Sequence, residues 1–141
     1  MTKLREIERR MLESALKGMQ SAYLLWGFAV GAAVLGEGGQ VYEGCNVESW
    51  VSGLGICAER SAVNHAILHG NRKIKGVATV GLASELEDEL WPCGMCLQYI
   101  FDLAESPRII ILTAKAEKTK ILFETVQMRP LEKLLPLPFK K

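Results

Sequence analysis

The sequence predicts an α/β fold in three layers, α/β/α, with a five-stranded mixed β-sheet between two layers of helices. Helical and strand-like segments alternate along the chain, which is the order typical of a sheet covered by helices on both faces. Residues 109–112 are four consecutive aliphatic residues, as expected of a strand that is buried on both sides. The 141 residues, 49% of them hydrophobic, are enough for one domain over residues 1–141 with a substantial core.

Each element is expected from its local pattern. Apolar residues at helical spacing mark the helices, and short apolar runs between glycine-rich turns mark the strands. The expected helices are an N-terminal one that ends near residue 20 and three more at 58–69, 93–105 and 126–135. The expected strands cover 28–35, 40–43, 77–83, 108–113 and 121–123. Residues 46–55, with two glycines, are expected to form a loop.

Three of the four cysteines form a pattern for binding a metal. Cys93 and Cys96, in Pro92-Cys93-Gly94-Met95-Cys96, are spaced so that two thiolates can bind one tetrahedral zinc ion. Cys57 can supply a third thiolate from a second segment. Three protein ligands leave one coordination position open for water, which is typical of a catalytic zinc rather than a structural one. The sequence therefore predicts Zn²⁺ held by Cys57, Cys93 and Cys96.

Two charged residues follow the first of these cysteines. Glu59, two residues after Cys57, is placed to carry protons beside the open coordination position. Arg60 can donate hydrogen bonds to the sulfurs and offset their negative charge. Two non-enzymatic alternatives are a structural zinc module and a thiol redox pair formed by Cys93 and Cys96, although a redox pair leaves the Cys57 segment unexplained.

The composition argues against several other classes of protein. The net charge is +1, with acidic and basic residues interspersed, so no nucleic-acid partner is expected. No apolar run approaches the roughly 20 residues of a membrane span, and the charged residues 1–17 do not resemble a secretory signal. Four cysteines, three of them in a metal pattern, suit a cytoplasmic protein better than a disulfide framework.

The pattern Cys57-Ala58-Glu59 followed by Pro92-Cys93-Gly94-Met95-Cys96 matches the signature of the zinc-dependent nucleobase deaminases. The chain resembles the short, three-cysteine cytidine deaminases, and the likeness extends from about residue 21 to residue 139. Further family-like segments are Phe28-Ala29-Val30-Gly31-Ala32-Ala33, Gly44-Cys45-Asn46-Val47-Glu48, Gly55-Ile56-Cys57-Ala58-Glu59-Arg60 and Leu134-Leu135-Pro136-Leu137-Pro138-Phe139. Each is weak alone, but together they follow the order of the family.

The resemblance implies a function and a set of site residues. The reaction would be hydrolytic deamination of cytidine or 2′-deoxycytidine to the uracil nucleoside and ammonia, in pyrimidine salvage. Glu59 would be the catalytic proton carrier, and the substrate would contact Phe28, Asn46, Glu48 and Ala58. Because Asn46 and Glu48 alternate along an extended segment, both side chains can face the same side and bind a sugar hydroxyl. The family also implies a homotetramer in which Phe139 reaches a neighbouring subunit's active site.

Four places depart from the family pattern. Residues 23–27 replace a Tyr-x-Pro-Tyr-Ser segment, Ser49 replaces an asparagine, Trp91 replaces a small residue, and Leu97 replaces an arginine. None of them is a predicted zinc ligand or the proton carrier, so deamination remains the expected reaction. Several can lie near the substrate, which leaves open a related amino-nucleoside such as blasticidin S or a modified cytidine.

Overall fold

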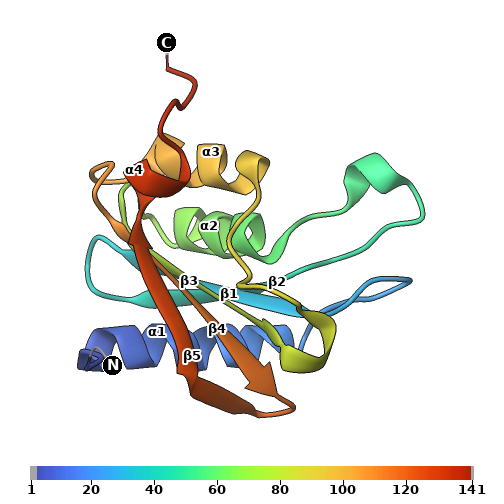
Figure 1. The fold of residues 1–141 in the computed structure, drawn as a ribbon. Coiled ribbons are helices and arrows are strands. Elements are labelled where there is room, and N and C mark those ends of the chain that lie inside the picture. Colours follow the sequence, from blue (N-terminus) through green and yellow to red (C-terminus); the bar gives the residue numbers. More distant parts are fainter. Residues whose placement is uncertain (1–2, 141) are drawn as a thin grey trace.

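The computed structural model describes residues 3–140, and positions 1, 2 and 141 of the predicted domain lie outside the described residues. Its centre is a five-stranded sheet with the strand order β2-β1-β3-β4-β5 (Figure 1). The strands are β1 Val30–Gly36, β2 Val41–Cys45, β3 Ile74–Leu82, β4 Ile110–Glu117 and β5 Lys120–Pro130. The helices are α1 Glu6–Met19, α2 Ala58–Leu68, α3 Gly94–Leu103 and α4 Leu131–Leu134.

The sheet is mixed, as predicted. Strand β1 pairs antiparallel with both β2 and β3, β3 and β4 are parallel, and β5 returns antiparallel to β4. The parallel pair needs a long crossover connection, and α3 lies within it. The elements expected at 28–35, 40–43, 58–69, 77–83 and 93–105 are present with boundaries shifted by a few residues.

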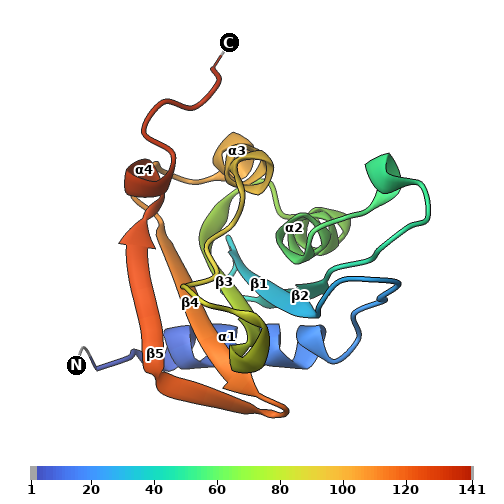
Figure 2. The ribbon, with the colours of Figure 1, turned by 45° about the vertical axis from the view of Figure 1, so that its right-hand side comes forward.

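Helices cover both faces of the sheet, which confirms the three-layer prediction. Helix α1 lies on one face, and α2, α3 and α4 lie on the other (Figures 1 and 2). Each face has its own buried apolar cluster, and β4 contributes to both, with Ile111 on the α2 and α3 side and Leu112 on the α1 side. This alternation explains the uninterrupted aliphatic run of that strand.

Two glycines let helices lie unusually close to the sheet. A Cβ atom on Gly31 of β1 would lie 1.8 Å from the carbonyl oxygen of Ala15 in α1. A Cβ atom on Gly44 of β2 would lie 2.3 Å from the backbone nitrogen of Ala62 in α2. Both opposing atoms belong to the backbone, so neither contact can be relieved by a change of rotamer.

The helix predicted over 126–135 is wrong for its first half. Residues up to Pro130 continue β5, and only Leu131–Leu134 forms a helix. The side chains of Val126 and Met128 pack against the α1-side core, with the two-residue period of a strand. Proline in a helix interior removes a hydrogen bond and also disfavours the helical conformation of the preceding residue. Pro130 therefore contradicted a continuous helix already in the sequence.

Within residues 3–140, the structure has no helix that combines the length and the apolar character of a membrane span.

Candidate active site

Three thiols from two helices meet on the α2 and α3 side of the sheet. Cys57 is the N-cap residue of α2, Cys93 is the N-cap residue of α3, and Cys96 is buried in the first turn of α3. Their three sulfur atoms all lie within 4.8 Å of one another. With Zn–S bonds of about 2.3 Å, sulfurs around a tetrahedral zinc ion are about 3.8 Å apart. The three thiols therefore fit Zn²⁺ with only small adjustments.

The surroundings of Cys57 favour its thiolate. The neighbouring Cys96 thiol, together with the nearby Arg60 guanidinium, lowers the pKa of Cys57 to about 5, and the proximity of Cys57 raises the pKa of Cys96. Arg60 Nη2 lies 3.9 Å from Cys57 Sγ and 3.4 Å from the carbonyl oxygen of Gly55. Arg60 Nε is buried and has no hydrogen-bond acceptor among the described residues. The guanidinium thus lies beside the sulfurs as predicted, with one buried donor to spare.

Glu59 lies in the first turn of α2 and is only 6% exposed. Burial raises the pKa of its carboxyl group to about 7, and the neighbouring Cys57 charge acts in the same direction. A carboxyl group with such a pKa can both accept and release a proton near neutral pH, which is the property that a general acid–base requires.

A cavity of about 260 Å³ adjoins the thiols and Glu59. It brings together the residues predicted as catalytic, substrate-binding and metal-binding from four separate segments, namely Phe28, Asn46, Glu48, Cys57, Ala58, Glu59 and Cys93. Cys96 does not line the cavity but is buried beside the other two thiols, and Arg60 lines the neighbouring groove between α2 and α3. Gly27, Val30, Leu90 and Trp91 also line the cavity. Their only sequence signal was proximity to motif residues, and Trp91 was noted only as a departure from the family pattern.

Asn46 and Glu48 both point to the same side, as predicted, and both hold the loop before β1. The Asn46 amide accepts a hydrogen bond from Val30 N and donates one to the carbonyl oxygen of Phe28, each 2.9 Å long. Glu48 Oε1 accepts hydrogen bonds from three consecutive backbone N–H groups at residues 25–27. These bonds lower the pKa of Glu48. The second oxygen, Oε2, has no hydrogen-bond donor among the described residues.

Phe139 lies apart from the cavity in the single chain, with 77% of its surface exposed. Its backbone is nevertheless held in place by α3. The Gln98 amide donates to the carbonyl oxygen of Phe139 at 3.0 Å and accepts from its N–H at 2.8 Å. The C-terminal segment is therefore fixed to the helix that carries two of the three thiols.

A model of the cytidine and deoxycytidylate deaminase zinc-binding region matches residues 5–113. The chain belongs to this family. A cytidine deaminase of Sporosarcina psychrophila is 34% identical over 137 residues, which cover 96% of this chain and 93% of that relative. A blasticidin-S deaminase of Bacillus cereus is 27% identical over 116 residues, which cover 78% and 76%.

The fold agrees with that of solved cytidine deaminases. The crystal structure of the Burkholderia pseudomallei cytidine deaminase superposes with a TM-score of 0.81 at 29% identity, covering 96% of this chain and all of that one. This family membership and the three-thiol cluster together assign Zn²⁺ as the cofactor of this deaminase.

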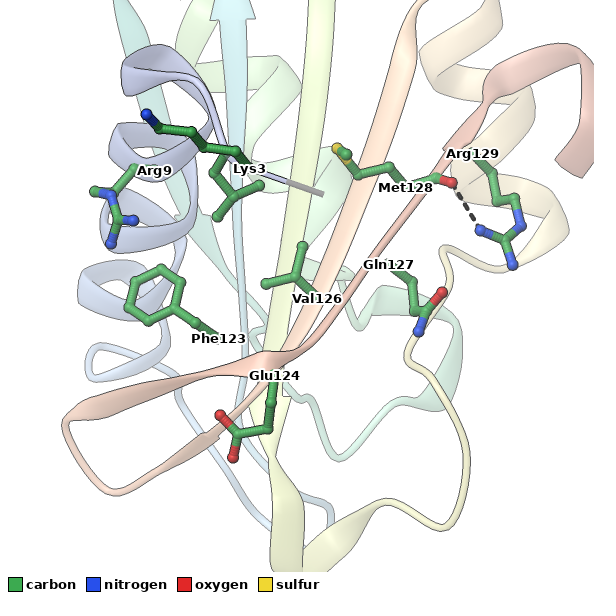
Figure 3. Close-up of a pocket in the computed structure, with 9 residues that line it drawn as sticks. Lys3, Arg9, Phe123, Glu124, Val126, Gln127, Met128 and Arg129 are labelled. Atoms are coloured by element: carbon green, nitrogen blue, oxygen red, sulfur yellow. Dashed lines mark hydrogen bonds between the residues drawn. The ribbon is translucent and has the colours of Figure 1, made fainter. Parts of the chain in front are cut away.

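The deaminase also has a larger groove, and the residues that line it are far from the three thiols in the sequence. It has a volume of about 700 Å³ and lies beside the free edge of β5, between that strand and the start of α1 (Figure 3). Lys3, Arg9 and Arg129 stand around it. Charged side chains at an exposed edge strand commonly prevent pairing with other strands, and none of the predicted site residues lines this groove.

Proposed function

We propose that the chain is a zinc-dependent hydrolase that converts cytidine or 2′-deoxycytidine to uridine or 2′-deoxyuridine and ammonia, and that it serves pyrimidine salvage. The observation that carries this proposal is the single cavity in which a three-thiol cluster, a buried carboxyl group and an Asn–Glu pair converge. Each of the three chemical tasks, which are metal binding, proton transfer and sugar recognition, has its own residues there.

Glu59 is the residue that moves protons. Cys57, Cys93 and Cys96 would hold a zinc ion, which would supply a Lewis acid that activates water. The Glu59 carboxylate accepts a proton released from the water and delivers it to the ring N3 of the substrate. The Glu59 carboxylate then takes the second proton, from the hydroxyl group added to the ring carbon, and passes it to the departing amine, so that water and cytidine become uridine and ammonia. Arg60 donates to the Cys57 sulfur over 3.9 Å and helps to hold it in place.

The lining of the cavity favours a neutral nucleoside over a nucleotide. Among the described residues that line it, none is a lysine, arginine or histidine, whereas two are glutamates. A 5′-phosphate would find no positive partner there and two carboxylates nearby. Phe28, 36% exposed, offers an aromatic surface to the base, and Ala58 offers the backbone at the start of α2, where helix N–H groups are unpaired.

The Asn46 and Glu48 side chains read the sugar. Their bonds to the loop fix their orientation, and Glu48 Oε2 stays available for a ribose hydroxyl. A site built to bind a hydroxyl rejects a substrate that lacks it by up to about 10⁴-fold, because polar groups are then left unpaired. Cytidine should therefore react far faster than free cytosine or 3′-deoxycytidine.

The test is ammonia release from cytidine, 2′-deoxycytidine, cytidine 5′-monophosphate, cytosine and 3′-deoxycytidine. Glu48→Ala should reduce the difference in rate between cytidine and each of the last two compounds. Glu124 is an exposed carboxylate at the larger groove, and Glu124→Ala should leave these differences unchanged. Equal rates on cytosine and cytidine would show that Asn46 and Glu48 do not recognise the sugar. A zinc-loaded protein that releases ammonia from none of these compounds would contradict the proposed reaction.

A second candidate is deamination of a related amino-nucleoside. The loop 23–27 departs from the family pattern and carries Trp26, whose ring lies 5.7 Å from that of Trp50. Both rings are exposed beside Gly27 and Glu48 of the cavity wall. One relative of this chain is a blasticidin-S deaminase. Adding blasticidin S to the panel distinguishes the candidates, because a higher kcat/KM on it than on cytidine would favour this one.

We also propose a cytoplasmic homotetramer built from a single domain over residues 1–141. Leu137 and Phe139 are largely exposed, although Gln98 holds the backbone at Phe139, which suits a side chain presented to a neighbouring subunit. All four thiols are free, as a reducing compartment requires. Deleting residues 137–141 should weaken assembly or activity, and sedimentation of a fully active monomer would contradict the proposal.

A further inference from the structure

Two buried hydroxyl groups converge on one backbone carbonyl of the cavity wall. Thr79 Oγ1 and Thr113 Oγ1 donate to the carbonyl oxygen of Leu90, at 2.7 Å and 2.8 Å. The two threonines face each other across the parallel β3–β4 pair, and each is only 1% exposed. They share a sheet face with Val77 and Ile111, which is the side of α2, α3 and the thiols.

Burying a hydroxyl group costs free energy unless it is hydrogen-bonded. Valine has nearly the same shape and would suit this apolar layer of parallel strands better. Thr79 Oγ1 also lies 3.5 Å from the carbonyl oxygen of Leu112 in β4, but this contact is much longer than the two bonds to Leu90 in the connecting segment. Their location therefore points to a role in holding that segment.

The same segment is also fitted to the sheet through a side chain. Gly81 lies two residues after Thr79 on the same strand, and a Cβ atom there would lie only 2.8 Å from Leu90 Cδ2 and 3.0 Å from Leu86 Cδ1. The missing side chain of Gly81 thus leaves the room that Leu90 occupies. Leu90 is held at its carbonyl by hydroxyl groups and at its side chain by close packing.

Leu90 directly precedes the part of the chain that forms the site. The connection between β3 and α3 crosses the sheet and enters α3 at Cys93 (Figure 2). Leu90, Trp91 and Cys93 all line the cavity. Three residues span at most about 10 Å, so fixing the carbonyl of Leu90 restricts where the Cys93 sulfur can lie.

We propose that Thr79 and Thr113 are positioning residues that hold Cys93 in place as a zinc ligand and fix the cavity wall at Leu90 and Trp91. This inference rests on the proposed zinc-dependent function of the site. Neither threonine touches the metal or the substrate, and each acts through the Leu90 carbonyl. Loss of both donors should allow the connection to shift, which should weaken zinc binding and raise the KM for the nucleoside.

The test compares valine and serine replacements in the zinc-loaded protein. Thr→Val at both positions removes the hydroxyls and keeps the shape, whereas Thr→Ser at both positions keeps the hydroxyls. We expect the double valine variant to release zinc to a chelator faster by about 10–100-fold, the range typical of outer contacts to metal ligands. In each single valine variant, the rate of zinc release should rise by less than the square root of that factor, because the other hydroxyl still donates to the Leu90 carbonyl. The double serine variant should stay close to wild type.

Zinc release distinguishes positioning from general stability when it is compared with the thermal unfolding temperature. A folded double valine variant that keeps zinc as firmly as wild type would overturn the proposal, as would equal effects of serine and valine. If the double valine variant does not fold, the comparison of Thr113→Val with Thr113→Ser tests the proposal instead. The proposal then requires the valine variant to release zinc faster than the serine variant. Zinc release is measured without substrate. A protein that holds zinc but deaminates no nucleoside would therefore refute the proposed reaction and would not refute the positioning role of the two threonines.

Discussion

Gly44→Ala should damage both the stability and the site of this deaminase. The new Cβ atom would lie 2.3 Å from Ala62 N, 2.7 Å from the carbonyl oxygen of Ala58 and 2.8 Å from Ala62 Cα. Non-bonded heavy atoms prefer separations of about 3.5–4.0 Å, so α2 must retreat from β2 by about 1 Å. Overpacking of this kind costs about 1–3 kcal/mol, and we expect the upper end because only backbone atoms oppose the new methyl group.

The displaced helix carries the site at its first turn. A destabilisation of about 3 kcal/mol lowers the Tm of a domain of this size by roughly 6–12 °C. Cys57 and Glu59 move with α2, and a misplacement of about 1 Å can reduce the rate about 10²-fold. The assay is thermal unfolding together with kcat/KM for cytidine and zinc content.

Gly38→Ala is the matched control. Gly38 lies in the turn between β1 and β2, and no atom lies within 4 Å of its Cβ position. If Gly44→Ala unfolds at the same temperature as Gly38→Ala and keeps full activity, the close approach of β2 and α2 does not constrain the helix, and the reasoning fails.

Four further changes test the site and the tail. Glu59→Gln should reduce kcat by about 10⁴-fold or more, the upper end for general acid–base catalysis, while zinc analysis shows full occupancy; Cys57→Ala should lose the metal as well. The lowered pKa of Glu48 means that its carboxylate anchors the loop above its ordinary pKa of 4.5 and releases it only as the pH falls through the lower folded-state value. Tryptophan fluorescence should therefore change in that acidic window in the wild type, and a Glu48→Gln variant with the same transition would contradict this. Gln98→Ala should free the backbone at Phe139 and shift sedimentation toward smaller species, and an unchanged assembly with unchanged activity would remove Gln98 from that role.

The sequence predicted most of the fold because most elements have strong local patterns. The strand 110–117 begins within an uninterrupted aliphatic run, and the helix at Cys57 begins where its apolar period begins. The last strand was predicted too short because its second half is stabilised by pairing with β4, the preceding strand of the same hairpin, and β-propensity depends strongly on such context. Pro130 was the one local feature that indicated the correct answer.

The site was predictable for a different reason. Metal ligation and proton transfer need particular residue types at close spacing, so Cys57, Glu59 and the Cys93–Cys96 pair are visible in the sequence alone. The contacts of Leu90 are not, since threonines on two strands and a carbonyl in a connection meet only through the tertiary fold. Glu48 is an intermediate case. Its spacing from Asn46 predicted that the two side chains face the same side, but nothing in the sequence indicated the three backbone N–H groups that Glu48 binds.

The positions of the two chain ends have a practical consequence. The described part of the chain starts beside α1 on one face of the sheet and finishes beyond α3 on the other (Figure 1). A fusion partner, an affinity tag or a surface linker attached before α1 therefore has the sheet between itself and the thiols. The same attachment after Phe139 would pull on the segment that Gln98 holds against α3. Immobilised or tagged preparations should be made from the N-terminal side, and C-terminal fusions should be treated as perturbed variants of the protein.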